Sequence, residues 1–273
     1  MIRDITLGQY FPGKSLVHRM DARVKIVLTF VFIIFIFIAN NLPAMLLMVG
    51  MVLSAMLLSG ISVRQYLKSL KAVIIVVALT SVLNLFYGSG DILVQWGFLT
   101  IRTGGVINCI FIAVRIISLI LFSSVLTFTT SPTDLTDALE RIMKPLKVFH
   151  VKVHEIAMMM TIALRFVPTL LEETDKIMSA QKARGADMES GGAIQRAKAL
   201  IPILIPLFVS SFRRAYELAM AMECRCYRGG EGRTKMKSLH MTILDGWAIA
   251  VSSAACVGVA LCVMLLPLSL IHI

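Results

Sequence analysis

Five nearly uninterrupted apolar runs most limit what this chain can fold into. They cover residues 24–40, 43–59, 72–87, 105–128 and 244–268. Each is close to the ~20 residues that an α-helix needs to cross a hydrocarbon core about 30 Å thick. Of the 273 residues, 58% are hydrophobic and 16% are charged, whereas soluble domains are about one quarter charged. The sequence therefore predicts an all-α polytopic membrane protein with about five transmembrane helices.

The distribution of lysine and arginine predicts how these helices are oriented. The N-terminal lead (1–23), the loop at 60–71 and the stretch 131–240 are basic, while the turn at 40–43 has no basic residue. Basic loops favour the cytoplasmic side of a membrane. We therefore expect a bacterial-type cell membrane protein whose N-terminus and 131–240 stretch are cytoplasmic and whose C-terminus is outside.

The formal net charge of +11 has the same explanation. Basic residues collect in cytoplasmic loops beside anionic headgroups, and no nucleic-acid-binding motif accompanies the charge. We expect the lipid bilayer to be a partner and nucleic acid not to be one.

The stretch 131–240 is apolar in patches but rich in charge, which predicts a cytosolic arm of long crossing helices. Ser131-Pro132-Thr133-Asp134 is typical of a helix start. Longer helical patterns cover 151–183 and 193–227, and Pro202 and Pro206 should kink the second one. The apolar runs inside them are short and bracketed by charges. Amphipathic helices near the inner membrane face are therefore favoured, with two additional spans as the alternative.

The two long helices have similar endings. Ala183-Arg184-Gly185 closes the first, and Cys224-Arg225-Cys226 closes the second. An arginine near a helix C-terminus can simply complement the helix dipole. The arginine is repeated at the matching ends of two helices, which favours a second role, contact with a partner protein. Arginine presents a planar set of donors, and its small neighbours allow the partner to approach closely. Two such ends suit a partner with two copies or two related halves.

Residues 8–15, GQYFPGKS, match the phosphate-binding pattern G-x-x-x-x-G-K-[ST] letter by letter. A working P-loop joins a buried strand to a helix in a parallel sheet. Here the downstream helix is a membrane span, and no βαβ pattern follows. We interpret the match as a Pro-Gly turn.

Other polar residues give weaker signals. Cys224 with Cys226, and His150 with His154, each supply half of a possible metal site that nothing obvious completes. Arg115 lies within an apolar run and should face the bundle interior, with Asn84, Asn108 or backbone carbonyls as candidate partners. No nucleophile–base set is evident, so we expect no catalytic residue.

Several motifs together resemble one family along nearly the whole chain. They are Tyr10-Phe11-Pro12-Gly13-Lys14-Ser15 with His18, Asp21 and Arg23-Val24-Lys25, then Thr130-Ser131-Pro132, Leu164-Arg165-Phe166-Val167-Pro168 and the two arginine endings. The chain resembles the transmembrane T component (EcfT) of energy-coupling factor (ECF) transporters, in the CbiQ/EcfT family. These are ABC-type importers of vitamins and related micronutrients.

The resemblance implies a non-catalytic coupling subunit. In that family, two Ala-Arg-Gly signatures dock into grooves of two ABC ATPase subunits. Ala183, Arg184 and Gly185 match outright, whereas Cys224, Arg225 and Cys226 keep the arginine but replace its neighbours. A separate small membrane subunit, the S component, binds the substrate, and the partner ATPases bind ATP and Mg²⁺. No cofactor is expected in this chain. A dedicated cobalt or nickel importer, and a secondary carrier with a regulatory arm, are the alternatives.

Overall fold

The computed structural model describes residues 10–86, 92–96, 99–186, 192–230 and 240–265. In chain order the elements are α1 (Leu16–Arg19), α2 (Ala22–Ile38), α3 (Leu42–Ser59), α4 (Val63–Phe86), β1 (Ile92–Trp96), β2 (Leu99–Arg102), α5 (Thr103–Thr129), α6 (Pro132–Ile142), the 3-10 helix η1 (Lys144–Phe149), α7 (Val153–Ala183), α8 (Ala193–Cys224) and α9 (Ile243–Leu265). They form two compact units. The first contains α1 to α5, the start of α6, and α9; the second contains the end of α6, η1, α7 and α8.

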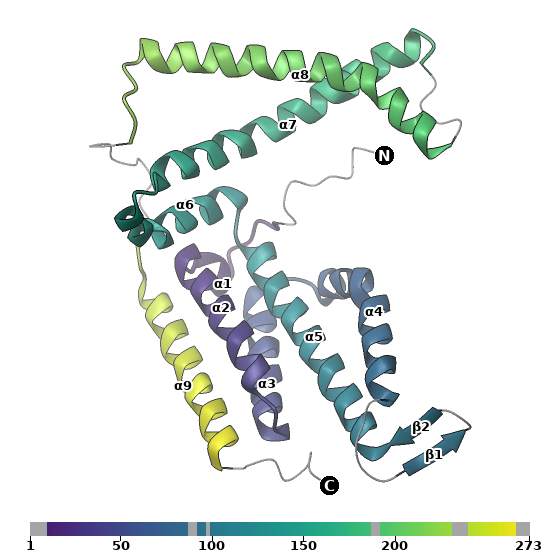
Figure 1. Cartoon of the computed structure of the whole chain (residues 1–273). Coiled ribbons are helices and arrows are strands. Elements are labelled where there is room, and N and C mark those ends of the chain that lie inside the picture. The colour runs from purple at the N-terminus through teal and green to yellow at the C-terminus, as the bar shows by residue number, and fades with distance from the viewer. Residues whose placement is uncertain (1–9, 87–91, 97–98, 187–191, 231–239, 266–273) are drawn as a thin grey trace. The chain divides into compact units, whose positions relative to one another are not determined.

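In the first unit, α2, α3, α4, α5 and α9 run side by side (Figure 1). Their core is centred on Phe32 of α2 and Phe122 of α5, whose rings stack with centroids 4.0 Å apart. Ile36, Met48 and Val259 bury their side chains in the same cluster, which therefore joins α2, α3, α5 and α9. Beside it, α4 packs along α5.

The outer surfaces of these helices carry large apolar side chains. Leu57 is 82% exposed and Ile75 is 75% exposed, which suits a lipid environment. Among the residues that the structure describes, six helices are long and apolar enough to cross a membrane: α3, α4, α5, α7, α8 and α9. The predicted class, an all-α polytopic membrane protein, is confirmed.

The six candidates do not coincide with the five predicted spans, because one predicted span is missing from them and two further helices are included. The run predicted at 24–40 folds as α2, which has 17 residues and is one residue shorter than α3, the shortest of the six. The two further helices, α7 and α8, have the lowest mean hydropathy of the six candidates. Length and composition therefore do not decide whether α7 and α8 cross the bilayer. Residues 266–268 of the predicted fifth span lie outside the described residues.

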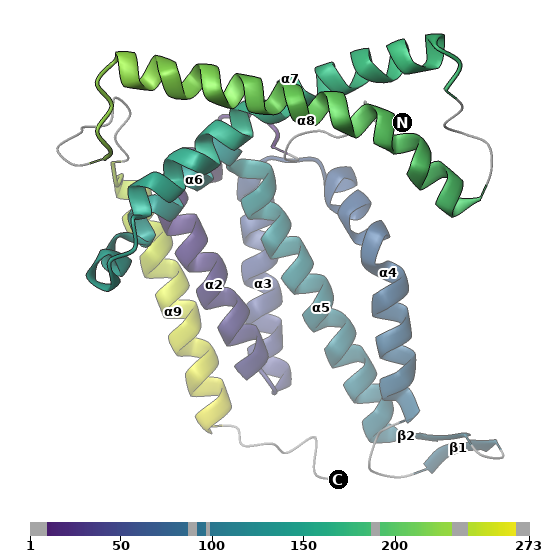
Figure 2. The same cartoon turned by 45° about the horizontal axis from the view of Figure 1, so that its top comes forward.

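A short antiparallel hairpin lies between α4 and α5 (Figure 2). Ile92 is opposite Arg102, and Trp96 is opposite Leu99. The sequence predicts no strand here, because four or five residues are too few for a clear alternating pattern.

Charged side chains join the ends of three helices in the first unit. The side chain of Asp21 caps α2, while the backbone N–H of Asp21 donates to Asp245 Oδ1 at 2.8 Å. Lys25 Nζ donates to the carbonyl of Thr129, the last residue of α5, at 3.0 Å. Asp21, Lys25 and Asp245 are 6%, 6% and 1% exposed. The carboxylates lie at the positive N-terminal ends of α2 and α9, and the ammonium at the negative C-terminal end of α5, so each charge matches its helix dipole. We call these three residues with Thr129 the α2 polar network.

Asp245 is the member of this network that the sequence reasoning missed. The N–H and hydroxyl of Thr242 donate to Asp245 Oδ2 at 2.7 and 2.9 Å, so the Asp245 carboxylate supplies one half of a capping box at the start of α9. The spacing Thr-x-x-Asp before an apolar run was the available signal. No sequence signal indicated the hydrogen bond between Asp245 and Asp21, which lies 224 residues away in the chain.

We predict that Asp245→Ala destabilises the protein by about 2–3 kcal/mol, because the buried N–H of Asp21 loses its acceptor and the start of α9 loses its bond to Thr242. A lower apparent melting temperature in detergent would show this. Ser253→Ala, at an exposed position of the same helix, is the control. Equal melting temperatures for the two variants would contradict the assigned role.

Candidate functional site

In the second unit, α7 and α8 cross each other, as both overall views show (Figures 1 and 2). Near the end of α7, Gln181 Nε2 donates to the carbonyl of Pro202 at 3.3 Å. Earlier in α7, Glu173 accepts hydrogen bonds from Ser210 and Arg214, which come later in α8. Contacts that advance in opposite directions show that the two helices are antiparallel. Their C-terminal ends therefore lie on opposite sides of the crossing.

The end of α7 is a Schellman motif, in which two backbone bonds close the helix. Arg184 is the C-cap, and Gly185 follows in the left-handed region with φ +86°. The N–H of Gly185 donates to the Lys182 carbonyl, and the N–H of Ala186 donates to the Gln181 carbonyl, both at 3.0 Å. Glycine suits this position because it has no Cβ to clash in the left-handed conformation.

The end of α8 repeats this motif with a different residue in the left-handed position. Arg225 is the C-cap, and Cys226 follows with φ +55°. The N–H of Cys226 donates to the Glu223 carbonyl at 2.8 Å, and the N–H of Tyr227 donates to the Met222 carbonyl at 3.0 Å. The two arginines thus occupy the same position of the same backbone motif.

Both arginine ends are open to the surroundings of the second unit. All six residues predicted from the sequence are exposed: Ala183, Arg184, Gly185, Cys224, Arg225 and Cys226. Within the described chain, neither guanidinium group forms a hydrogen bond or an ion pair. The structure keeps the two ends apart, so they are two separate contact points rather than one pocket.

The distribution of polar and apolar side chains around α8 is the reverse of that on a surface helix of a soluble protein. Its face toward α7 includes Ser210 and Arg214 beside buried Ile203. The other side carries large apolar side chains that are at least half exposed, which we call the α8 apolar face: Ile201, Leu204, Ile205, Phe208, Val209 and Phe212. Such a surface is typical of contact with lipid or with a protein partner.

The candidate metal ligands have other surroundings. His154 Nδ1 lies 3.0 Å from Glu140 Oε1, while His150 is exposed in a left-handed conformation with φ +61°. Cys224 and Cys226 are exposed at the end of α8. Among the described residues, no three or more His, Cys, Asp or Glu side chains come together as a group that could hold a metal ion.

The P-loop-like lead packs around His18. His18 Nε2 donates to the carbonyl of Phe11 at 2.9 Å, so its Nδ1 accepts from the Ser15 hydroxyl at 2.6 Å. Gly13 lies so close that a Cβ there would be 2.7 Å from the ring. Ser15 caps α1, a helix of four residues, and Phe11 N–H donates to the Phe128 carbonyl. These contacts support a turn that fastens the lead to the end of α5; Gly8 and Gln9 of the motif lie outside the described residues.

Arg115 of α5 contacts one of the kinds of partner that the sequence predicted. Its guanidinium donates to the carbonyl of Ala39, just past the end of α2, at 2.9 Å and to Asn40 Oδ1 at 3.1 Å. A backbone carbonyl was among the expected partners. Asn84 was another, but it donates to Thr80 of its own helix instead. The cation therefore complements the C-terminal end of α2.

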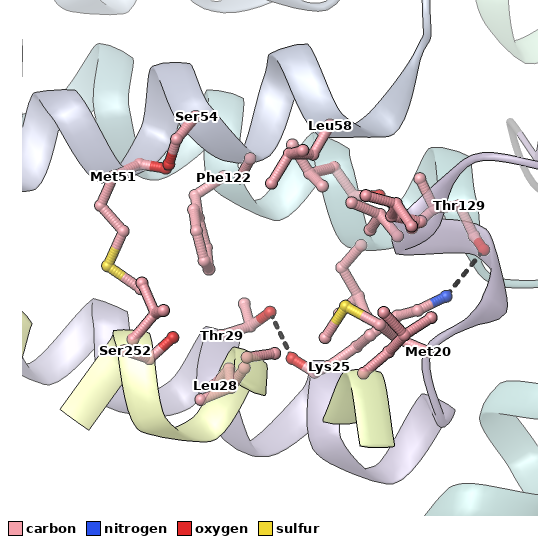
Figure 3. Close-up of a pocket in the computed structure, with 18 of the residues that line it drawn as sticks. Met20, Lys25, Leu28, Thr29, Met51, Ser54, Leu58, Phe122, Thr129 and Ser252 are labelled. Atoms are coloured by element: carbon pink, nitrogen blue, oxygen red, sulfur yellow. Dashed lines mark hydrogen bonds between the residues drawn. The ribbon is translucent and has the colours of Figure 1, made fainter. Parts of the chain in front are cut away.

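A cavity of about 270 Å³ lies in the first unit between α2, α3, α5 and α9 (Figure 3). Its lining is mostly apolar, with Phe122 and Met51 on one side and Leu28 on the other. Lys25 reaches Thr129 at one end, and the Thr29 hydroxyl donates to the carbonyl of Lys25 in its own helix. The polar groups of Lys25 and Thr29 are thus engaged within the protein, and a mostly apolar lining suits apolar contact better than recognition of a polar substrate.

Known proteins similar to this chain identify its family. The family described as CbiQ, cobalt transport protein, matches residues 13–236. The energy-coupling factor transporter transmembrane protein EcfT of Ruminiclostridium cellulolyticum is 54% identical over 90% of this chain and 92% of its own length. The chain belongs to the EcfT family.

Other members with the same description are similarly close. The protein from Clostridium kluyveri is 50% identical over 97% of both chains, and that from Bacillus subtilis is 46% identical over 90% of this chain and 93% of its own. The resemblance noted in the sequence is therefore confirmed. The chain is the transmembrane component of an energy-coupling factor transporter.

We predict opposite effects for two substitutions at the helix ends. Cys226→Gly should stabilise the end of α8 by about 1 kcal/mol, because a non-glycine residue costs roughly 1–2 kcal/mol in the left-handed region. Gly185→Ala should destabilise the end of α7 by a similar amount for the same reason. Hydrogen exchange of the capping amides of Tyr227 and Ala186 measures each effect locally. Changes of the same sign would contradict the matched geometry.

Proposed function

We propose that this chain is the non-catalytic coupling subunit of an ECF-type importer for a vitamin or related micronutrient. Arg184 and Arg225 each dock into one of two ABC ATPase subunits. The ATPases bind ATP and Mg²⁺, and their movement passes through α7 and α8 to a membrane S component that carries the substrate.

The observation that carries this proposal is the repeated helix end. Two exposed arginines occupy equivalent C-cap positions on opposite sides of one antiparallel crossing. A guanidinium group can donate several hydrogen bonds in a fixed plane to carboxylates or carbonyls of a partner. A pair of equivalent, separated contact points matches a pair of equivalent partners. Ala183, Gly185, Cys224 and Cys226 contribute by leaving space beside the arginines.

The α8 apolar face supports a second part of the proposal. Its exposed aromatic and aliphatic side chains need an apolar environment, while the charged residues of α7 and α8 need a polar one. Both needs are met if the two helices lie along the inner membrane face as a coupling arm, with part of the apolar face covered by the S component. In this arrangement the N-terminus and the arm are cytoplasmic, and the C-terminus is outside.

The description of the matching family as a cobalt transport protein favours one alternative, a dedicated importer of cobalt or nickel. The coupling role of the chain is the same in both cases. Neighbouring genes for two ATPases together with a dedicated metal-binding subunit would indicate the metal importer. Purification without any ATPase would instead favour a secondary carrier.

We predict that Arg184→Ala and Arg225→Ala each weaken co-purification with candidate ABC ATPases, and that the double variant abolishes it. A lost charge-assisted contact is worth about 1.5–3 kcal/mol, or roughly tenfold or more in affinity. Arg165→Ala and Arg213→Ala, at exposed positions of the same two helices, are matched controls. Normal assembly of the double variant would refute the docking role.

We also predict that Phe208→Asn on the α8 apolar face weakens co-purification of the S component and leaves the ATPases bound. The side chain is 66% exposed in the isolated chain, so its apolar surface is available for burial in a complex. Glu217→Gln, at another exposed position of α8, is the control. Unchanged recovery of the S component with Phe208→Asn would argue against this contact surface.

A further inference from the structure

A cluster of four side chains joins α7 to α8 near the middle of their crossing. Both carboxylate oxygens of Glu173 are used, since Ser210 Oγ donates to one and Arg214 donates to the other at 3.0 Å. The guanidinium carbon of Arg214 also lies 5.9 Å from the centre of the Phe166 ring. Ser210 and Arg214 are one turn apart on α8, so the cluster holds α8 against sliding along α7 and against rotation about its own axis.

A second polar contact braces the same crossing. Because Pro206 has no N–H, the carbonyl of Pro202 lacks the donor it would have in a regular helix. Gln181 of α7 supplies one across the interface. Gln181 follows Glu173 by eight residues and Pro202 precedes Ser210 by eight, so the two contacts share one antiparallel register and lie about 12 Å apart along each helix. Two separated attachments fix an angle, whereas one alone would allow the helices to turn about it.

The cluster is equally far from the two arginine ends. Eleven residues separate Glu173 from Arg184, and eleven separate Arg214 from Arg225. Each segment is therefore about 16 Å long. A force applied to either arginine therefore acts at the same distance from the cluster.

The chemistry of the cluster also indicates a role in geometry rather than in stability alone. Glu173 and Arg214 are 23% and 31% exposed, and Arg214 Nη1 is buried without a hydrogen-bond partner in the described chain. Well-packed apolar residues usually stabilise such an interface as well as an ion pair does, while a directional ion pair selects one arrangement. Since residues 199–209 of α8 are all apolar, this cluster and the Gln181–Pro202 contact are where the register of α8 against α7 is specified.

We propose that Glu173, Ser210 and Arg214 form a fixed pivot, a set of positioning residues that makes the two arginine ends move as one body. The proposal rests on the coupling role proposed above. With the pivot intact, movement of one docked ATPase is transmitted to the other end of the arm. Without it, both ATPases remain docked while the ends move independently.

The test is a distance measurement within the assembled complex. Spin labels at Ser179 and Ala221, both exposed near the two ends, report the distance between them in a chain whose five native cysteines are replaced. The unsubstituted pivot should give one narrow distance distribution that stays unchanged when MgATP is added, because the two ends move as one body. Glu173→Gln or Arg214→Met should broaden the distribution about twofold, because one arrangement becomes an ensemble, and should make the distance change when MgATP is added.

Neighbouring residues provide matched controls. Glu172→Gln and Arg213→Ala remove the same kinds of charge from exposed positions next to the pivot, and both should leave the distribution narrow. The exchanged pair, Glu173→Arg with Arg214→Glu, should restore the narrow distribution that MgATP leaves unchanged. ATPase co-purification should persist in every pivot variant.

Three results would overturn the pivot. The single variants could keep a narrow distance that MgATP leaves unchanged, the exchanged pair could fail to restore such a distance, or the single variants could lose the ATPases, which would make the cluster a folding element of the arm. Failure of the docking proposal is distinguishable, because it would appear as normal assembly after Arg184→Ala and Arg225→Ala with the pivot unchanged.

Discussion

The main physical constraint on this structure is that helix ends in an apolar environment need hydrogen-bond partners. The last backbone groups of a helix have no partner within it, and a bilayer offers them none. In the first unit, the α2 polar network meets this condition with Asp21, Lys25 and Asp245, each placed at the helix end whose dipole it complements. At the ends of α7 and α8, backbone bonds meet it instead. The side chains of Arg184 and Arg225 are therefore not needed to close their helices.

The same constraint distinguishes the two units in how they use polar residues. In the bundle, buried charges fix where helices end, and the packing between them is apolar, as with Phe32 and Phe122. Between α7 and α8, polar residues lie at the contact itself, and the apolar surface faces outward. A helix pair built in this way keeps a defined crossing and still offers a large surface to its surroundings. This combination fits a transmitting element better than a passive membrane anchor.

Much of the fold followed from local patterns. The apolar runs predicted the membrane class, and α7, predicted at 151–183, is observed at Val153–Ala183. Cap signals worked because they depend on a few neighbouring residues: Ser131 accepts from the amide of Asp134 as expected, and Gly185 is left-handed. The left-handed Cys226 was not foreseen, since nothing in its local sequence favours that conformation over an extended one. The hairpin of β1 and β2 was missed because its strands are too short for periodicity.

The sequence by itself determined the membrane class, the approximate extent of most helices and the two arginine endings, because apolar periodicity and capping act over a few residues. The tertiary structure decided which distant groups meet. Asp21 with Asp245, Arg115 with Ala39, and Glu173 with Arg214 are separated by 224, 76 and 41 positions. Their pairing depends on how whole helices pack and in which register, and no local pattern carries that information.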